Sequence, residues 1–269
     1  MTMIFADQAE GLRKVLAGEY VHTMLVACAL GQTGGLGFTS DFVRSLALNG
    51  RKVLVIDLSK DGGQLAQTFQ VYPRYDLQHF IEDRASLEEV LYPVGEGVLL
   101  LQASRGLDRL AGFSPAIHQG WINRLEKGLQ GVQFILVYTG LTLSDAALRA
   151  TDACQDCLLL SSTQKSTVTA AYAWLKAVRH KRREFWIYLN QTPAFEEALK
   201  VFDNMAYAAR DFLDVSLRFA GAASGKDGIN TLVEAIADWP CPKDAAVSLA
   251  AFLQRLCMSG VDKRVFHES

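Results

Sequence analysis

The sequence predicts an α/β fold: a doubly wound, mostly parallel sheet with helices on both faces. Short apolar runs recur along the chain without strict polar alternation, as in strands that are covered on both faces. Segments of helical period separate these runs, and such alternation is typical of parallel sheets. A chain of 269 residues can bury one large core, and no repeat or linker-like stretch divides it. We therefore expect a single domain over 1–269.

Six apolar runs are predicted strands, and a seventh run is a further candidate. The strands are expected at 23–30, 52–58, 97–104, 133–140, 156–162 and 184–190, with the candidate at 214–222. Helices are expected at 39–49, 63–69, 86–91, 114–128, 143–151, 167–181 and 194–211. Pro242 and Asp244 favour the start of a last helix over about 243–258.

Composition excludes several classes of protein. The formal net charge of -2 gives no global attraction to DNA or to acidic membranes. The chain has no apolar run of about 18 residues or more, and its start lacks the pattern of a signal peptide. Its five cysteines fit reduced cytosolic thiols. We expect a cytoplasmic protein, with peripheral contact at the inner membrane as the alternative.

Several motifs have structural explanations that need no ligand. Cys154 and Cys157 form a lone CxxC, best read as a helix end that leads into a buried strand, because a zinc site needs a second pair. The basic cluster at 179–184 closes a helix, where cations favour the helix dipole, so nucleic-acid binding is disfavoured. The stretch 224–228 resembles a phosphate loop, but Asp227 would repel phosphate. The scattered histidines give no metal-ligand spacing.

The last predicted helix has two interpretations. Its apolar face is rich in alanine and suits packing on the domain, and its polar face is not notably basic. Packing is favoured, and membrane contact is the alternative.

The stretch "GQTGGLGFTS" follows the first predicted strand and has the glycine spacing of a phosphate loop. Such a loop points successive backbone N–H groups at the phosphate, and its glycines allow positive φ. A lysine then reaches the β- and γ-phosphates, and a Ser or Thr hydroxyl holds magnesium. Here Phe38 stands at the position of the lysine, and Thr39 follows it. The pattern predicts a phosphate-loop architecture without its main positive charge.

The stretch "QTGGLGFT" resembles the GKGGVGKT loop of the MinD/ParA class of deviant Walker ATPases, with both lysines replaced. Within that class, the N-terminal segment 5–18 resembles the DQAxxLR element of the flagellar number and placement regulators, the FlhG or FleN family. The residues that match are Asp7, Gln8, Ala9, Leu12 and Arg13. The stretches "RYDLQHFIEDRASLEEVLYPVGEGVLLLQASRGLDRLAGF" and "SSTQKSTVTAAYAWLKAV" resemble later parts of the same family. The resemblance covers about residues 5 to 220 and implies a MinD/SIMIBI-like P-loop NTPase fold.

The resemblance also implies where a nucleotide site would lie. Thr33 matches the lysine that reaches across a dimer, Ser59 replaces the switch carboxylate, and Tyr138 replaces the Walker B aspartate. Asp57 is kept, and Asn190 matches an asparagine that contacts adenine. The full set of matching positions is Thr33, Gly34, Gly35, Gly37, Phe38, Thr39, Asp57, Ser59, Tyr138 and Asn190.

Four polar functions of the family's site are therefore replaced in this chain. Phosphoryl transfer depends almost wholly on positioned charge, so we expect a pseudo-ATPase with no catalytic residues and no cofactor. We expect the Phe38 ring to hold its segment by packing. The alternatives are an active or ATP-binding MinD-type ATPase, with ATP and Mg²⁺ as cofactors, or a divergent accessory ATPase of cellulose synthesis or partition.

The resemblance implies protein partners. In the resembled family the N-terminal element contacts FlhF, a GTPase of the signal-recognition-particle type, and other partners are flagellar components. An amphipathic helix capped by Asp7 is the alternative explanation of this segment. Without ATP between two loops, we expect a monomer or a dimer held by protein contacts alone.

Overall fold

The protein is described from a computed structural model that covers residues 21–59, 63–110, 112–192, 194–223, 226–237 and 248–258. The N-terminal segment, with Asp7, Gln8, Ala9, Leu12 and Arg13, lies outside the described residues. So do residues 243–247, where the last predicted helix was expected to begin.

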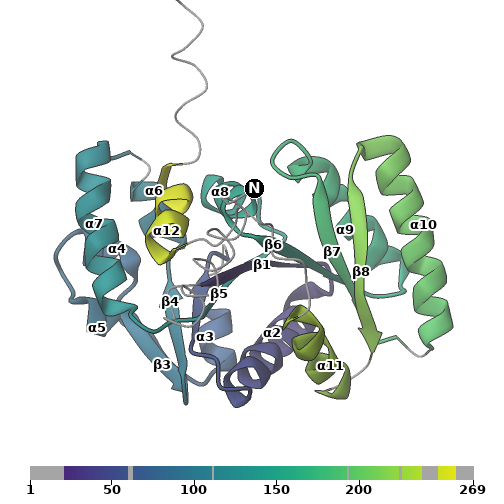
Figure 1. Cartoon of the computed structure of the whole chain (residues 1–269), viewed down its shortest axis with the longest axis horizontal. Helices are drawn as coiled ribbons and strands as arrows, with labels where there is room; N and C mark the ends of the chain where they lie inside the picture. The colour runs from purple at the N-terminus through teal and green to yellow at the C-terminus, as the bar shows by residue number, and fades with distance from the viewer. Residues whose placement is uncertain are drawn as a thin grey trace, which may run out of the picture.

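The described strands form one eight-stranded sheet in the order β3-β4-β2-β5-β1-β6-β7-β8 (Figure 1). All neighbours pair in parallel except β3 and β4, which are antiparallel. The strands are β1 (His22–Cys28), β2 (Val53–Asp57), β3 (Leu91–Gly95), β4 (Val98–Gln102), β5 (Phe134–Gly140), β6 (Asp156–Ser161), β7 (Glu184–Asn190) and β8 (Ser216–Ala223). The predicted fold class is confirmed, and so is the seventh strand candidate.

Helices cover both faces of this sheet. They are α2 (Gly31–Leu48), α3 (Gln64–Thr68), α4 (Leu77–Ile81), α5 (Leu87–Val90), α6 (Ser104–Leu110), α7 (Pro115–Gly128), α8 (Asp145–Ala153), α9 (Lys165–Val178), α10 (Phe195–Leu213), α11 (Lys226–Ala237) and α12 (Leu249–Met258). Helices α2, α3 and α11 bury their apolar residues in one core layer, and α4 to α10 together with α12 bury theirs in the other. Figure 1 shows α2, α3 and α11 together on the lower side of the view.

Sequence patterns missed β3, the short helices α4 and α6, and the longer helix α11, whose first residues lie in the stretch 224–228. The predicted helix at 86–91 ends at Val90, and the chain continues as β3, which contains Pro93. Helix α4 depends on a capping box in which Asp76 accepts from the backbone N–H of His79. The elements β3, α4 and α6 span only five to seven residues, too few to show a hydrophobic period, but α11 spans twelve.

The described part of the last helix packs on the domain, which is the interpretation that the sequence favoured. Helix α12 lies against α7 and α8, and Phe252 and Leu256 are buried there (Figure 1). Arg149 of α8 is only 8% exposed and donates to the carbonyl oxygens of Leu107, at 3.0 Å, and Leu256, at 3.2 Å. It also pairs with Asp108 at 3.2 Å. One buried guanidinium therefore joins α6, α8 and α12.

The lone CxxC has the structural role expected of it. Helix α8 ends at Ala153, β6 begins at Asp156, and both Cys154 and Cys157 are buried. Burial raises the pKa of the Cys157 thiol to about 11, so the thiol is protonated at neutral pH. Arg182, from the basic cluster, donates to the carbonyl oxygen of Cys154 at 2.6 Å. This basic residue therefore stabilises the entry to β6.

Two negative findings apply to the described ranges only. They contain no group of three or more His, Cys, Asp or Glu side chains placed to hold a metal ion. No helix within them has the length and apolar character needed to cross a membrane.

Candidate functional site

The predicted phosphate loop is helical, which corrects the expectation of a loop followed by a helix at 39–49. Helix α2 begins at Gly31, so positions 34–39 all lie within it. In an α-helix each N–H donates to the carbonyl four residues earlier, so the N–H groups of this stretch lie along the helix axis. Gly31 has a φ of +74°, whereas Gly34, Gly35 and Gly37 do not have positive φ. The geometry expected of a phosphate loop is therefore not formed.

Gly35 is explained by close packing. A Cβ atom at Gly35 would lie 2.4 Å from the Sγ of Cys28 and 3.2 Å from the hydroxyl of Tyr138. Only glycine therefore lets α2 approach β1 and β5 this closely. A Cβ at Gly37, in contrast, would meet nothing within 4 Å. Of these two glycines in the phosphate-loop pattern, Gly35 is thus required by packing, whereas Gly37 is not.

Phe38 is a core residue. Its side chain is 3% exposed, and its ring centroid lies 5.1 Å from that of Tyr188 and 5.8 Å from that of Phe42. The expectation that Phe38 holds its segment by packing is confirmed. The neighbouring Thr39 is fully buried, and its hydroxyl donates to the carbonyl oxygen of Gly35 at 2.8 Å. In the resembled loop the corresponding hydroxyl holds magnesium, whereas here it donates a hydrogen bond within its own helix.

Tyr138, which the resemblance matches to the Walker B aspartate, is buried beside Cys28 and Gly35. Burial raises the pKa of the Tyr138 phenol above its ordinary range, and the nearby Cys28 and Asp57 raise it further. Burial also raises the pKa of the Cys28 thiol to about 11. At neutral pH this position therefore carries a neutral phenol in place of a carboxylate.

Asp57 and Ser59 form a local pair. Asp57 is buried at the end of β2, and its Oδ1 accepts from the backbone N–H of Ser59 at 2.9 Å and from the Ser59 hydroxyl at 2.7 Å. Burial raises the pKa of the Asp57 carboxyl, and the hydrogen bonds from Ser59 oppose this effect. A carboxylate at position 59 would repel Asp57, whereas serine donates to it. Ser59 thus supplies a hydrogen-bonding partner for the buried Asp57.

The remaining predicted positions are Asn190 and Thr33. Asn190 is half-buried at the end of β7, and the next residue, Gln191, has a φ of 57°. The Nε2 atom of Gln191 lies 3.7 Å from the Cβ position of Gly34. Thr33 lies in α2, and its side chain is outside the described part of the chain. No Lys or Arg occurs at 30–39, 57–59, 138–142 or 190.

The structure adds three residues that sequence reasoning did not single out, namely Cys28, Phe42 and Tyr188. Cys28 and Tyr188 lie on the same face of the sheet as Tyr138 and join Phe38 and Phe42 in one apolar cluster. Alternation along β1 and β7 could have placed Cys28 and Tyr188 on one face. The contact between Phe38 and Tyr188 depends on the order of the strands, which local patterns do not contain.

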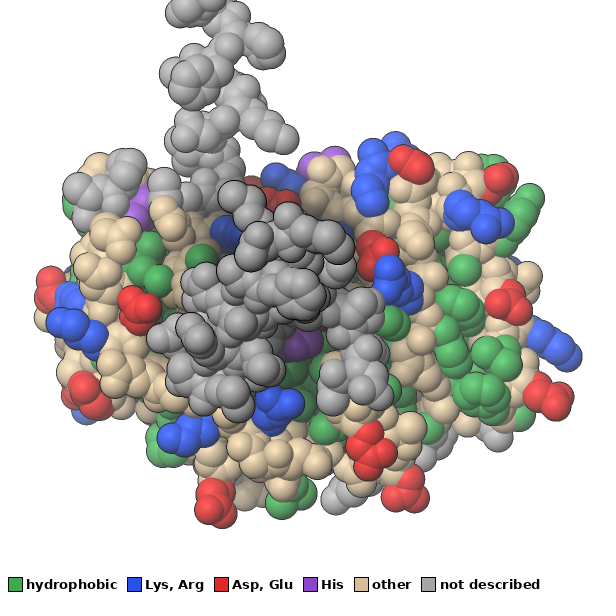
Figure 2. Space-filling model, in the orientation of Figure 1, with side chains coloured by type: hydrophobic (Ala, Val, Ile, Leu, Met, Phe, Trp, Pro, Cys, Tyr) green, Lys and Arg blue, Asp and Glu red, His purple; other side chains and the backbone are tan. Residues whose placement is uncertain are grey.

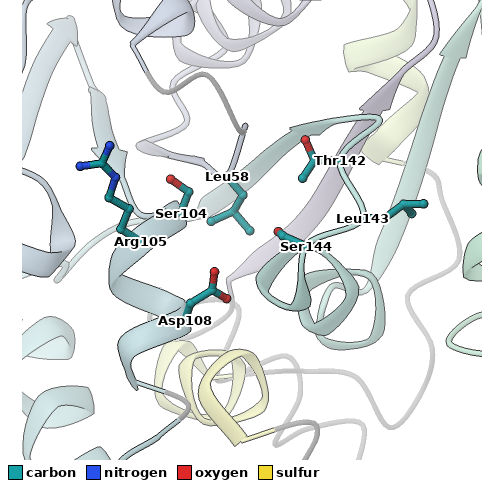
Figure 3. A pocket seen from close by; sticks show the side chains of 7 residues that line it. All are labelled: Leu58, Ser104, Arg105, Asp108, Thr142, Leu143 and Ser144. Carbon is teal, nitrogen blue, oxygen red and sulfur yellow. The ribbon is translucent and has the colours of Figure 1, made fainter.

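A separate cavity of about 450 Å³ opens near the carboxyl ends of β2 and β5 (Figure 3). Its lining residues are Leu58, Ser104, Arg105, Asp108, Thr142, Leu143 and Ser144. Asp108 is already paired with Arg149, and the Ser144 hydroxyl accepts from the backbone N–H of Ala147 at 3.3 Å. Figure 3 shows the Arg105 guanidinium extending away from Thr142 and Ser144. The cavity thus has a polar rim in which the charges do not converge.

The sheet order and the connection from β1 into α2 define the fold. The solved MinC:MinD cell division complex of Aquifex aeolicus has the same fold, with a TM-score of 0.54 over 88% of this chain and 96% of that chain, at 17% identity. No family model matches the chain. The fold is that of the MinD/ParA class of P-loop ATPases.

Two curated proteins are similar to this chain over most of its length. The chain is 24% identical over 264 residues to the antiactivator FleN of Pseudomonas aeruginosa, covering 88% of this chain and 94% of FleN. It is 24% identical over 206 residues to the flagellum site-determining protein YlxH of Helicobacter pylori, covering 75% of this chain and 69% of YlxH. These similarities support a MinD/ParA-class, FlhG-like protein.

Proposed function

We propose that this chain is an FlhG-like regulator of flagellar number or placement that acts through protein contacts and does not hydrolyse ATP. The names of its two relatives, an antiactivator and a flagellum site-determining protein, support the flagellar part of the proposal. The observation that carries the second part is the helical form of positions 34–39, with Phe38 buried among aromatic rings.

The residues present do not fit a bound Mg²⁺–ATP. A triphosphate needs convergent N–H donors, a cation and oxygen ligands for the metal. From Gly34 onward the N–H groups of α2 are directed at carbonyl oxygens of the same helix, and the Thr39 hydroxyl donates to Gly35. Phe38 and Tyr138 occupy the positions of a lysine and an aspartate with buried, uncharged rings. The proposed function therefore includes no step that passes through ATP.

Isothermal titration of the purified full chain with ATP and Mg²⁺ tests the loss of nucleotide chemistry. We expect no saturable heat of binding up to about 1 mM ATP. Any affinity for ATP would then be too weak to matter at ordinary protein concentrations. A parallel assay should detect no phosphate release above the buffer rate. Micromolar binding with measurable turnover would show instead a working MinD-type ATPase and would sink this part of the proposal.

The N-terminal segment is the proposed contact with a partner. Its resemblance to the DQAxxLR element supports binding to an FlhF-type GTPase, with Arg13 as the basic member of the motif. We expect Arg13→Glu to weaken binding of that GTPase roughly tenfold or more, the scale of a lost charged contact. Lys14→Glu makes the same charge change outside the motif, so it is the matched control and should retain binding.

Biolayer interferometry with the GTPase immobilised gives both dissociation constants. Equal loss in the Arg13 and Lys14 variants would indicate a general charge effect and would contradict a motif-specific contact. No binding by the unchanged chain would favour another class of partner, such as one in cellulose synthesis or partition.

A further inference from the structure

Asp57 is an acidic residue in the interior of the fold. It is 2% exposed at the carboxyl end of β2. Figure 2, in contrast, shows acidic and basic side chains at the surface of the molecule, where water solvates their charge. Removing a carboxylate from water is costly unless a cation or several donors take the place of the water. The contacts of Asp57 therefore decide whether this group can remain ionised.

The two carboxyl oxygens of Asp57 differ in their partners. Oδ1 accepts from the backbone N–H of Ser59 at 2.9 Å and from the Ser59 hydroxyl at 2.7 Å. Oδ2 is buried and has no hydrogen-bond partner within the described residues. An ionised carboxylate shares its charge between both oxygens, so Oδ2 would carry charge without a donor. In a protonated carboxyl group, Oδ1 keeps both donors as the carbonyl oxygen and Oδ2 carries the proton.

The neighbours of this carboxyl group in the sheet are uncharged. Asp57 pairs in register with Gln102 of β4 and with Tyr138 of β5. Burial raises the pKa of the Tyr138 phenol above its ordinary range and the pKa of the Cys28 thiol to about 11, so both groups are neutral at neutral pH. The sheet therefore places an amide, a phenol and a thiol around Asp57, and none of them is a cation.

Helix α2, which packs against β2, supplies no cation either. Its first charged residues are Asp41 and Arg44. Arg44 is exposed, lies 3.8 Å from Asp41 and stands over the Phe69 ring. The short helix α3 has no charged residue. Within the described part of the chain, then, no positive charge compensates an ionised Asp57.

The backbone holds the Asp57 side chain in this position. The carbonyl oxygen of Asp57 accepts from the N–H of Ala103 at 3.0 Å, and the N–H of Leu58 donates to the carbonyl oxygen of Tyr138 at 2.8 Å. The carboxyl group cannot move out to water by a shift of the backbone unless these bonds break. Its protonation can change more readily than its place in the core.

The pKa of Asp57 agrees with these surroundings. Burial is the largest influence and raises the pKa of the carboxyl group. The hydroxyl and the N–H of Ser59 lower it, and the N–H of Gly63 lowers it to a smaller extent. These groups are neutral dipoles, and together they do not offset the effect of burial.

We propose that Asp57 keeps its proton in the folded chain at neutral pH, so that the end of β2 is a pH-sensitive element of the fold. In the unfolded chain the same group is solvated and ionises at an ordinary pKa of about 3.9. Between the two pKa values the folded chain therefore binds one proton more than the unfolded chain. The stabilising contribution of this proton is complete below about pH 4 and is lost as the pH rises, about tenfold in the folding equilibrium constant per pH unit, until Asp57 ionises in the folded chain. This inference does not depend on the proposed flagellar role or on the loss of ATPase activity.

Asp57→Asn tests the assignment, because the amide has the shape of a protonated carboxyl group and its oxygen can accept both donors from Ser59. Urea unfolding of the full chain is measured between about pH 5 and pH 8. We expect the folding equilibrium constant of the variant to gain about tenfold on that of the unchanged chain for each pH unit. Asp203→Asn, which removes an exposed acid of α10, is the matched control and should follow the unchanged chain.

Carbon-13 NMR of the Asp57 carboxyl carbon in the unchanged chain gives a readout that needs no variant. We expect the chemical shift of a protonated carboxyl group at neutral pH, and a change to that of a carboxylate only at higher pH. Ser59→Ala removes a hydroxyl that favours the ionised form, so it should move this change to still higher pH. The chemical shift of a carboxylate at neutral pH, or the same pH dependence of unfolding with and without Asp57→Asn, would each overturn the proposal.

Discussion

Replacing Phe38 with lysine is expected to lower the free energy of unfolding by several kcal/mol and not to create an ATP site. The ring is 3% exposed between Phe42 and Tyr188. Removing a buried phenylalanine side chain costs about 3–5 kcal/mol, and burying an unpaired ammonium group costs more. Urea unfolding followed by circular dichroism measures the loss, and titration with ATP and Mg²⁺ checks for binding.

Phe38→Leu is the matched control, because it keeps an apolar side chain of smaller volume. Its expected cost is about 1–2 kcal/mol, the scale of a partly filled cavity. A lysine variant as stable as the leucine variant would contradict the buried position of this side chain. If it also bound ATP with micromolar affinity, the segment would be able to leave the helix and form a phosphate loop.

Replacing Arg149 with alanine is expected to lower the free energy of unfolding by about 2–4 kcal/mol, because buried acceptors are left without donors. The acceptors are the carbonyl oxygens of Leu107 and Leu256, and the carboxylate of Asp108 also loses its partner. One of these acceptors, Leu256, belongs to α12 and tethers that helix to α8. Trypsin should therefore cleave faster after Arg255 of α12 in the variant.

Two further substitutions separate the bridging role of Arg149 from its charge. Arg149→Lys keeps the charge but not the fork of donors, so it should recover only part of the stability. Arg183→Ala removes an exposed arginine that pairs with Asp214, and its expected cost is below about 1 kcal/mol. Equal losses for Arg149→Ala and Arg183→Ala would show that the buried contacts contribute little.

The residues at the positions of the resembled nucleotide site are held by packing and by local hydrogen bonds. Ser59 donates to Asp57, and the Tyr138 ring packs beside Gly35. Phe38 joins the apolar cluster on the same face of the sheet. Each replacement suits a packed interior, in which uncharged or hydrogen-bonded groups are favoured and a lone charge is costly.

Local patterns were sufficient for most of the fold because they are properties of single segments. A strand that is buried on both faces must be apolar along its length, so β1, β2, β5 and β7 are visible as apolar runs. The short edge strand β3 is not, because Pro93 interrupts it and its pairing depends on the hairpin with β4. The sequence also shows where charged residues of the resembled nucleotide site are replaced, because each replacement is a change of residue type.

By itself, then, the sequence determined the α/β class, the resemblance to the flagellar regulators, and the absence of both lysines from the loop after β1. Only the tertiary structure decided that this segment is a helix from Gly31 onward, although its glycines locally favour a loop. The physical reason is that the deciding contacts are distant in sequence. Gly35 must fit against Cys28 and Tyr138, and Phe38 packs against Tyr188, from strands that the order of the sheet brings together.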